Sequence, residues 1–143
     1  MQYLRNHLTY EIYHDLRESV GWKQYMETQV REALALSLYD VTVFDEKAGR
    51  YVGMGRVVGD GLYYLMVDVV VAQDWQGQGI GSEIVKRLSQ YIEEDTPAGG
   101  RGSIQGIAEK GKEQFYEQFG FKRLPNEYFG SGMRKGIWKQ KSE

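Results

Sequence analysis

An apolar run that ends in a glycine-rich turn is the feature of this chain that most restricts its fold. The run LYYLMVDVVV at residues 62–71 is rich in branched and aromatic side chains, as in a buried strand. The turn QGQGIG at residues 76–81 follows, and residues 80–95 then place apolar side chains along one face of a helix. A strand that enters a helix through such a turn predicts the middle of an α/β domain, where ligands favour the carboxyl ends of strands.

The segments before this unit predict two helices and two more strands. Residues 10–20 and 26–36 carry apolar residues at helical spacing on either side of a Gly-Trp break. Residues 37–44 and 51–58 are β-branched and aromatic, with a turn-like stretch between them. The Asp-Gly pair at residues 60–61 suits a tight hairpin turn with positive φ, so three antiparallel strands are expected in sequence.

The segments after it predict a short strand, a helix and two closing strands, at residues 103–108, 111–120, 121–124 and 132–138. In that helix Phe115 and Phe119 lie one turn apart on the buried face, and Gly120 is placed as a C-terminal cap. The expected fold class is α/β (α+β), with a single mixed, mainly antiparallel sheet flanked by helices. Residues 1–143 are expected to form a single domain, large enough to bury a core without disulfides or a structural metal.

The composition excludes several classes of function. There is no cysteine, which excludes thiol catalysis, disulfide frameworks and Cys-ligated zinc. His7 and His14 are seven residues apart, too far along one helix to share a metal, and no metal is expected. The net charge of −2 argues against binding to nucleic acid by phosphate neutralisation. No apolar run reaches the roughly 20 residues of a membrane-spanning helix and no signal-peptide pattern is present, so a cytoplasmic location away from membranes is expected.

The glycine turn has two interpretations. A helix N-terminus exposes unpaired N–H groups, and glycines let an anion reach them without meeting a Cβ atom, which favours a phosphate site. The alternative is a tight strand-to-helix turn that needs only positive φ. The motif GxGxxG does not fit because Ser82 stands at its last position, and no GK[ST] of a P-loop follows. The motif QxxGxG does fit, with Gln76, Gly79 and Gly81.

Two motifs together resemble those of the GCN5-related N-acetyltransferases, the GNAT superfamily. The run VVVAQDWQGQGIGSEIVKRL carries a [RQ]xxGx[GA] loop with Gln76 in place of the commoner arginine, and FYEQFGF follows about 35 residues after the loop. The resemblance extends from roughly residue 36 to the C-terminus, and it implies the GNAT acyltransferase fold with acetyl-CoA as cosubstrate. Glu109 stands where the family often has an asparagine, so a contact of Glu109 with acetyl-CoA stays open.

The resemblance also implies which residues hold acetyl-CoA. Main-chain groups of Val69, Val70 and Val71 are expected to pair with the pantetheine arm as another strand would. The pyrophosphate is expected on the loop and on the first turn of the helix, which comprise Gln76, Gly77, Gln78, Gly79, Ile80, Gly81 and Ser82.

Direct attack of a primary amine on the thioester, which the family uses, needs a base for the ammonium, a donor for the oxyanion and an acid for the departing thiolate. A backbone N–H such as that of Val69 is a candidate oxyanion donor. The resemblance implies that Tyr116 in FYEQFGF is the catalytic acid, because the family's motif supplies a tyrosine beside the thiol. A phenol with a pKa of about 10 can protonate a thiolate whose thiol pKa is about 8.5. The alternative is that Tyr116 only packs, as one of eleven tyrosines.

Asp68 is the candidate catalytic base. It is the only charged residue in the apolar strand, and alternation places it on the face of Met66 and Val70. An unpaired carboxylate there costs several kcal/mol, and burial would raise its pKa toward a value useful for a base. Glucosamine-6-phosphate acetyltransferases carry a similar acidic pair, of which Val67 replaces the first member here. A structural carboxylate that braces the acceptor loop is the alternative, and both roles stay open.

The acceptor is the part of the function that the sequence determines least. In the family's fold the N-terminal helices and the closing strands usually wall the acceptor pocket, which nominates Trp22, Tyr25, Arg56, Tyr128 and Phe129. The alternative for each of them is ordinary packing or placement on the surface. The aromatic side chains suit an aryl or alkyl amine, whereas Arg56 suits an acceptor with a carboxylate or phosphate. The leading prediction is N-acetylation of a small-molecule primary amine, and the alternatives are a protein or peptide N-acetyltransferase and a non-catalytic acyl-CoA-binding sensor. Family members often pair through C-terminal strands, so the resemblance implies a homodimer through residues 132–138, and an internal strand there is the alternative.

Overall fold

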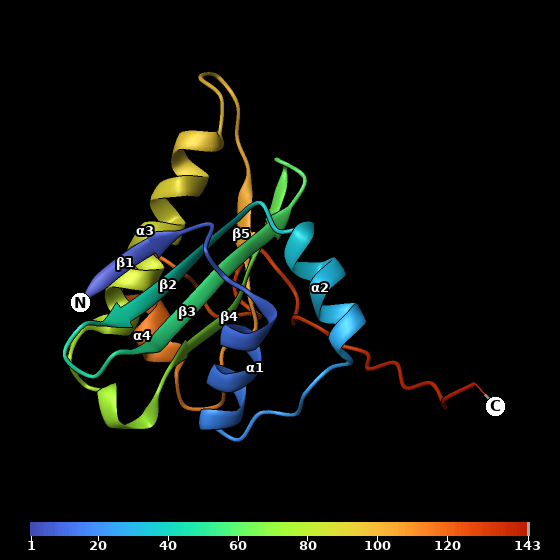
Figure 1. The fold of residues 1–143 in the computed structure, drawn as a ribbon. Helices are drawn as coiled ribbons and strands as arrows, with labels where there is room; N and C mark the ends of the chain where they lie inside the picture. Colours follow the sequence, from blue (N-terminus) through green and yellow to red (C-terminus); the bar gives the residue numbers. More distant parts are fainter. Residues whose placement is uncertain (143) are drawn as a thin grey trace. The chain divides into compact units, whose positions relative to one another are not determined.

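A five-stranded sheet in the order β1-β2-β3-β4-β5 forms the centre of the first of two compact units (Figure 1). This computed structural model describes residues 1–142. The chain divides into two compact units, Met1–Ile107 and Ala108–Glu143. The first four strands are antiparallel neighbours, and β4 pairs with β5 in parallel. The strands are β1 (Gln2–Arg5), β2 (Tyr39–Asp45), β3 (Arg50–Gly59), β4 (Tyr63–Val71) and β5 (Ser103–Gln105). The predicted mixed, mainly antiparallel sheet is confirmed.

The helices of the first unit cover both faces of this sheet (Figure 1). Helix α3 packs against β2, β3 and β4, and α1 packs against β3 and β4. Adjacent residues of β3 point to opposite faces of the sheet. Gly55 faces Ile84 of α3, whereas the Arg56 side chain reaches Tyr13 of α1. The elements are α1 (Tyr10–Ser19), α2 (Glu27–Ala35), the 3₁₀ turn η1 (Gln73–Trp75), α3 (Ile80–Asp95) and, in the second unit, α4 (Glu113–Glu117).

Two glycines in β3 let α3 approach the sheet closely. A Cβ atom at Gly53 would lie 3.1 Å from Ile84 Cδ1, and one at Gly55 would lie 2.7 Å from Ile84 Cγ2 and 2.9 Å from Leu88 Cδ1. The buried face of α3 fills this space with Ile80, Ile84, Val85, Leu88 and Ile92. The contact fixes the position of the N-terminus of α3, where the glycine turn lies.

Gly55→Ala is therefore expected to destabilise the protein by about 1–3 kcal/mol, because a methyl group inserted into a packed core displaces its neighbours. Thermal or urea denaturation measures the change. Gly130→Ala is the matched control, since a Cβ atom at Gly130 would meet nothing within 4 Å. Equal stability of the two variants would show that α3 can move away from β3 at little cost.

Several expectations from the sequence need correction. The short edge strand β1 was not predicted, since its four residues show no clear alternation. The predicted hairpin turn after β3 is wider than two residues. Gly59 pairs with Tyr64, Gly61 has φ 96°, and the Asp60 carboxylate accepts bonds from the amides of Leu62 and Tyr63. The Asp60 side chain thus organises the turn.

The predicted closing strands are the larger error, because no strand occurs between residues 106 and 142. Residues 121–124 are too few and are followed at once by Pro125. Residues 132–138 contain two glycines and no regular alternation, both of which disfavour a strand. In the second unit α4 is shorter than predicted, while Phe115 and Phe119 do contact each other at 5.4 Å between ring centroids.

Candidate functional site

The glycine turn combines left-handed backbone with open space above it. Gly77 and Gly79 have φ of 79° and 85°, a conformation that disfavours residues with side chains. A Cβ atom at either position would meet no atom within 4 Å. Close packing against protein therefore does not explain these glycines, and the space that they leave lies open to a ligand.

Unpaired amide groups line this space. Gly79 is the N-cap of α3 and its cap makes no side-chain hydrogen bond. The first intrahelical bond runs from the Glu83 N–H to the Gly79 carbonyl at 3.1 Å. The amides of Ile80, Gly81 and Ser82 therefore have no acceptor within residues 1–142. This arrangement fits an anion such as a pyrophosphate.

Two side chains attach the turn to the sheet. The Gln76 amide donates to the Val71 carbonyl at 3.0 Å, which ties the loop back to the end of β4. The Trp75 indole N–H donates to Asp45 Oδ2 at 2.7 Å, and the Arg50 guanidinium lies 4.7 Å from the Trp75 ring. The turn is thus positioned by the ends of β2, β3 and β4.

One edge of β4 is open beside the turn. On that edge β5 pairs only with Tyr63, Tyr64 and Leu65. Beyond Leu65 no strand of the described chain pairs with β4 on that side, so the stretch that includes Val69, Val70 and Val71 has no strand partner along this edge. Such an edge can accept an extended ligand as an added strand.

A β-bulge interrupts β4 at Asp68. The register changes between the pairs Met54–Val70 and Arg56–Val67, and Asp68 has a positive φ of 55°. Consequently Val67 and Asp68, although adjacent, line the same cavity. The expected alternation with Met66 is wrong here, because an extra residue in the strand changes which face later side chains occupy. Positive φ at a residue other than glycine stores strain of the kind found at functional sites.

Asp68 is held in a buried cluster of complementary groups. Its Oδ1 accepts bonds from Arg17 Nη1 at 2.9 Å and from the Tyr13 hydroxyl at 3.3 Å, and its Oδ2 accepts one from Arg56 Nε at 2.7 Å. The side chains of Arg17, Arg56 and Asp68 are 10–13% exposed. Burial, followed by the Asp68 charge, raises the pKa of Tyr13 to about 12, so this phenol stays protonated and keeps donating.

Sequence reasoning missed Tyr13 and Arg17, which are two of the hydrogen-bond partners of Asp68. Both lie on the buried face of α1 beside Leu16. The Arg17 guanidinium is also surrounded by the rings of Tyr13, Trp22 and Tyr25, at 5.0–5.4 Å. An arginine at helical spacing among apolar residues was the available signal, since such a charge requires a partner.

A cavity of about 330 Å³ lies beside this cluster, between α1, α2 and the sheet. Of the residues nominated for the acceptor pocket, Tyr25 and Arg56 line it, and Trp22 packs on Arg17 instead. Tyr128 and Phe129 belong to the second unit and are exposed. The apolar lining comes mainly from Tyr13, Val30, Leu34 and Val67.

Tyr116 lies in the second unit, on α4. Its ring contacts Phe115 at 5.1 Å and Phe121 at 5.7 Å between centroids. Burial, and then the Glu109 carboxylate, raises the pKa of the Tyr116 phenol above 10. The side chain is therefore protonated at neutral pH, as an acid requires.

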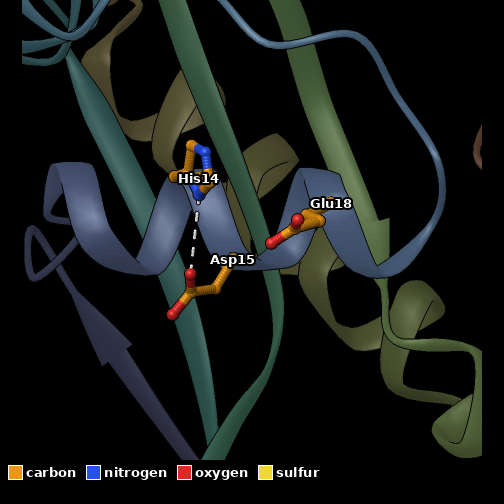
Figure 2. Close-up of side chains that lie close together, drawn as sticks. All are labelled: His14, Asp15 and Glu18. Carbon is orange, nitrogen blue, oxygen red and sulfur yellow. Dashed lines mark ion pairs between the residues drawn. The ribbon is translucent and has the colours of Figure 1, made fainter.

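A cluster on α1 is the one group in residues 1–142 whose side chains could hold a metal ion. Ligand atoms of His14, Asp15 and Glu18 lie within 4.8 Å of one another (Figure 2). His14 Nδ1 is 3.6 Å from Asp15 Oδ1, and both acids are exposed. His7 does not take part, since its Nε2 contacts the Tyr51 hydroxyl at 2.8 Å. Exposed clusters of this type are common without an ion.

Comparison with known proteins agrees with this geometry. The family model for the acetyltransferase (GNAT) domain matches residues 12–136. A probable acetyltransferase from methicillin-resistant Staphylococcus aureus is 28% identical and superimposes with a TM-score of 0.79, over 94% of this chain and 98% of that one. A Mycobacterium tuberculosis protein solved in complex with CoA shares the fold at 16% identity, with a TM-score of 0.61 over 87% of this chain and 76% of that one.

Two curated relatives match over most of the chain. An uncharacterized N-acetyltransferase of Pyropia yezoensis is 29% identical over 78% of this chain and 63% of its own length. Serotonin N-acetyltransferase 2, chloroplastic, of Oryza sativa subsp. japonica is 33% identical over 75% of this chain and 53% of its own length. The chain thus spans less than two thirds of the length of these relatives. No helix within residues 1–142 is long and apolar enough to cross a membrane.

Proposed function

The chain belongs to the GNAT acetyltransferase family, and from this premise we propose that it transfers acetyl groups from acetyl-CoA to a primary amine of a small molecule. The observation that carries the proposal is the open edge of β4 next to the uncapped N-terminus of α3. The edge suits an extended pantetheine arm, and the unpaired amides suit a pyrophosphate. The rice relative is named for serotonin, a small primary amine, which supports a small-molecule acceptor.

The residues present fit acetyl-CoA, because Gly77 and Gly79 leave open space above amides that lack acceptors. Acetyl-CoA would supply the activated acetyl group as a thioester. We assign the amides of Gly77 to Ser82 to the pyrophosphate and the main chain of Val69 to Val71 to the pantetheine. The Val69 N–H would then donate to the oxyanion that forms when the amine attacks.

Asp68 in this proposal positions the acceptor cavity and does not act as the base. Its two oxygens already accept three hydrogen bonds, two of them from guanidinium groups. An ammonium ion that approached either oxygen would have to compete with Tyr13, Arg17 and Arg56 for it. The ammonium would lose its proton to water before the amine attacks, and Tyr116 would donate a proton to the departing thiolate.

An amine panel with acetyl-CoA, read by thiol release, tests the proposal. Turnover of a small amine supports it, and turnover of peptides alone would favour a protein acetyltransferase instead. Binding of acetyl-CoA without any turnover would indicate a sensor. The proposed location is cytoplasmic, and the rice relative, named chloroplastic, makes fractionation of the native host a useful complement.

Gly79→Val is expected to weaken acetyl-CoA binding by roughly tenfold to a hundredfold. A β-branched residue is strained at φ 85°, and its side chain would occupy the space above the amides. Gly99→Val is the matched control, because Gly99 has φ 80°, meets nothing within 4 Å and lies beyond the other end of α3. Calorimetry with acetyl-CoA measures both. Unchanged affinity of Gly79→Val for acetyl-CoA would show that the pyrophosphate does not bind at this turn.

A further inference from the structure

The cluster beside the cavity, formed by Arg17, Arg56 and Asp68, carries an excess of positive charge. Two guanidiniums, from Arg17 and Arg56, surround the single Asp68 carboxylate. Arg56 and Asp68 are the basic and acidic side chains in the lining of the cavity among residues 1–142, and Arg17 lies behind Asp68. Because charges are screened little at low exposure, the excess of one positive charge attracts an anionic group.

Arg56 retains donors that the protein does not use. Its Nε donates to Asp68 Oδ2 at 2.7 Å and its Nη1 donates to the Ser37 hydroxyl at 3.0 Å. No acceptor in residues 1–142 takes a bond from Nη2, and this atom is not among the fully buried polar atoms that lack a partner. Arg56 lines the cavity, so a ligand that enters the cavity can approach this side chain.

Arg17 differs from Arg56 in this respect. Its Nε and Nη2 donate to the Lys23 carbonyl at 3.3 and 2.7 Å, and its Nη1 donates to Asp68. Every nitrogen of this guanidinium is engaged, and Arg17 does not line the cavity. Arg17 therefore fixes Asp68, which in turn orients Arg56 toward the cavity.

We propose that the cavity selects primary amines that also carry a carboxylate, and that Arg56 is the residue that binds this carboxylate. The apolar walls formed by Tyr13, Val30 and Leu34 would contact the rest of such a molecule, so an amino acid with an apolar or aromatic side chain is the class of acceptor that fits. The inference rests on the proposed acetyl transfer and narrows its substrate.

Matched pairs of amines test the proposal. With native protein and acetyl-CoA, kcat/KM for tyrosine and phenylalanine is expected to exceed that for tyramine and phenethylamine by roughly tenfold to a hundredfold, as one charge-assisted hydrogen-bonding contact allows. Arg56→Met should remove this preference, whereas Arg87→Met, an exposed arginine on α3, should keep it. Equal or better turnover of the amines without a carboxylate would overturn the inference and leave the acetyltransferase proposal intact.

A binding measurement on native protein keeps the test independent of turnover and of the stability of the variants. By calorimetry 3-phenylpropanoate is expected to bind at least tenfold more tightly than 3-phenylpropanol, which has the same body without the charge. Equal binding of the two would reject the carboxylate site. Tighter binding of phenethyl phosphate than of the carboxylate would also reject it, in favour of a phosphorylated acceptor. Absence of turnover for every amine would instead reject the acetyltransferase proposal.

Discussion

Asp68→Asn is expected to lower the free energy of unfolding by about 3–5 kcal/mol, which is the usual cost of breaking a buried ion pair by removing one partner. Asparagine preserves the shape and tolerates the positive φ of 55° at this position, so backbone strain does not contribute. The loss arises because Arg17 and Arg56, with side chains 10% and 13% exposed, would remain close together without an intervening carboxylate. Urea denaturation monitored by circular dichroism measures it.

Glu83→Gln is the control that shows how much of the loss in stability depends on burial of the ion pair. Glu83 pairs with Arg87 at 2.9 Å, the same separation as Arg17 to Asp68, but both side chains are one third exposed or more. This exposed pair is expected to contribute at most about 1 kcal/mol. Similar losses in both variants would mean that the Asp68 cluster is no more important for stability than a surface pair.

The same variant separates the two roles that the sequence left open for Asp68. A positioning carboxylate predicts a larger KM for the amine and an unchanged pH profile of kcat. A general base predicts instead that kcat loses its dependence on pH on the acidic side. Disappearance of that acidic limb in Asp68→Asn would restore Asp68 as the base.

The elements with strong local patterns were predictable from the sequence. Helix α3 spans Ile80–Asp95 as expected, because a left-handed glycine precedes it and Pro97 follows soon after its end. The glycine turn was also predictable, because its glycines lie between an apolar strand pattern and a helical pattern. Its two interpretations both require the positive φ that Gly77 and Gly79 show, so the affinity of Gly79→Val for acetyl-CoA is the measurement that separates them.

The environment of Asp68 was not predictable from local patterns. Its partner Arg17 is 51 residues away in sequence, and Arg56 is on a different strand. Strand alternation repeats every two residues and does not show where an extra residue forms a bulge. Alternation alone therefore predicted that Asp68 lies on the same face as Met66. The Asp68 carboxylate has no partner in its own strand, and its hydrogen bonds come from residues that only the fold brings close to it.

Tyr116→Phe is expected to lower kcat by about 10²–10⁴-fold, the usual contribution of a general acid, while acetyl-CoA binding changes little. Phenylalanine keeps the ring contacts with Phe115 and Phe121 and removes only the hydroxyl. Single-turnover thiol release measures the chemical step without product release.

The pH dependence of this step follows from the raised pKa of Tyr116. The phenol is protonated below that pKa, and burial together with Glu109 moves it above the ordinary value of 10. The acid form is then fully present at neutral pH and is lost only as the pH rises through the raised pKa, so kcat should show no basic decline below about pH 10. Tyr63→Phe, at the start of β4 and 62% exposed, is the control and should retain full activity. A Tyr116→Phe enzyme as fast as the native one would mean that the thiolate leaves without a proton from this tyrosine, and Tyr116 would then serve only to pack α4.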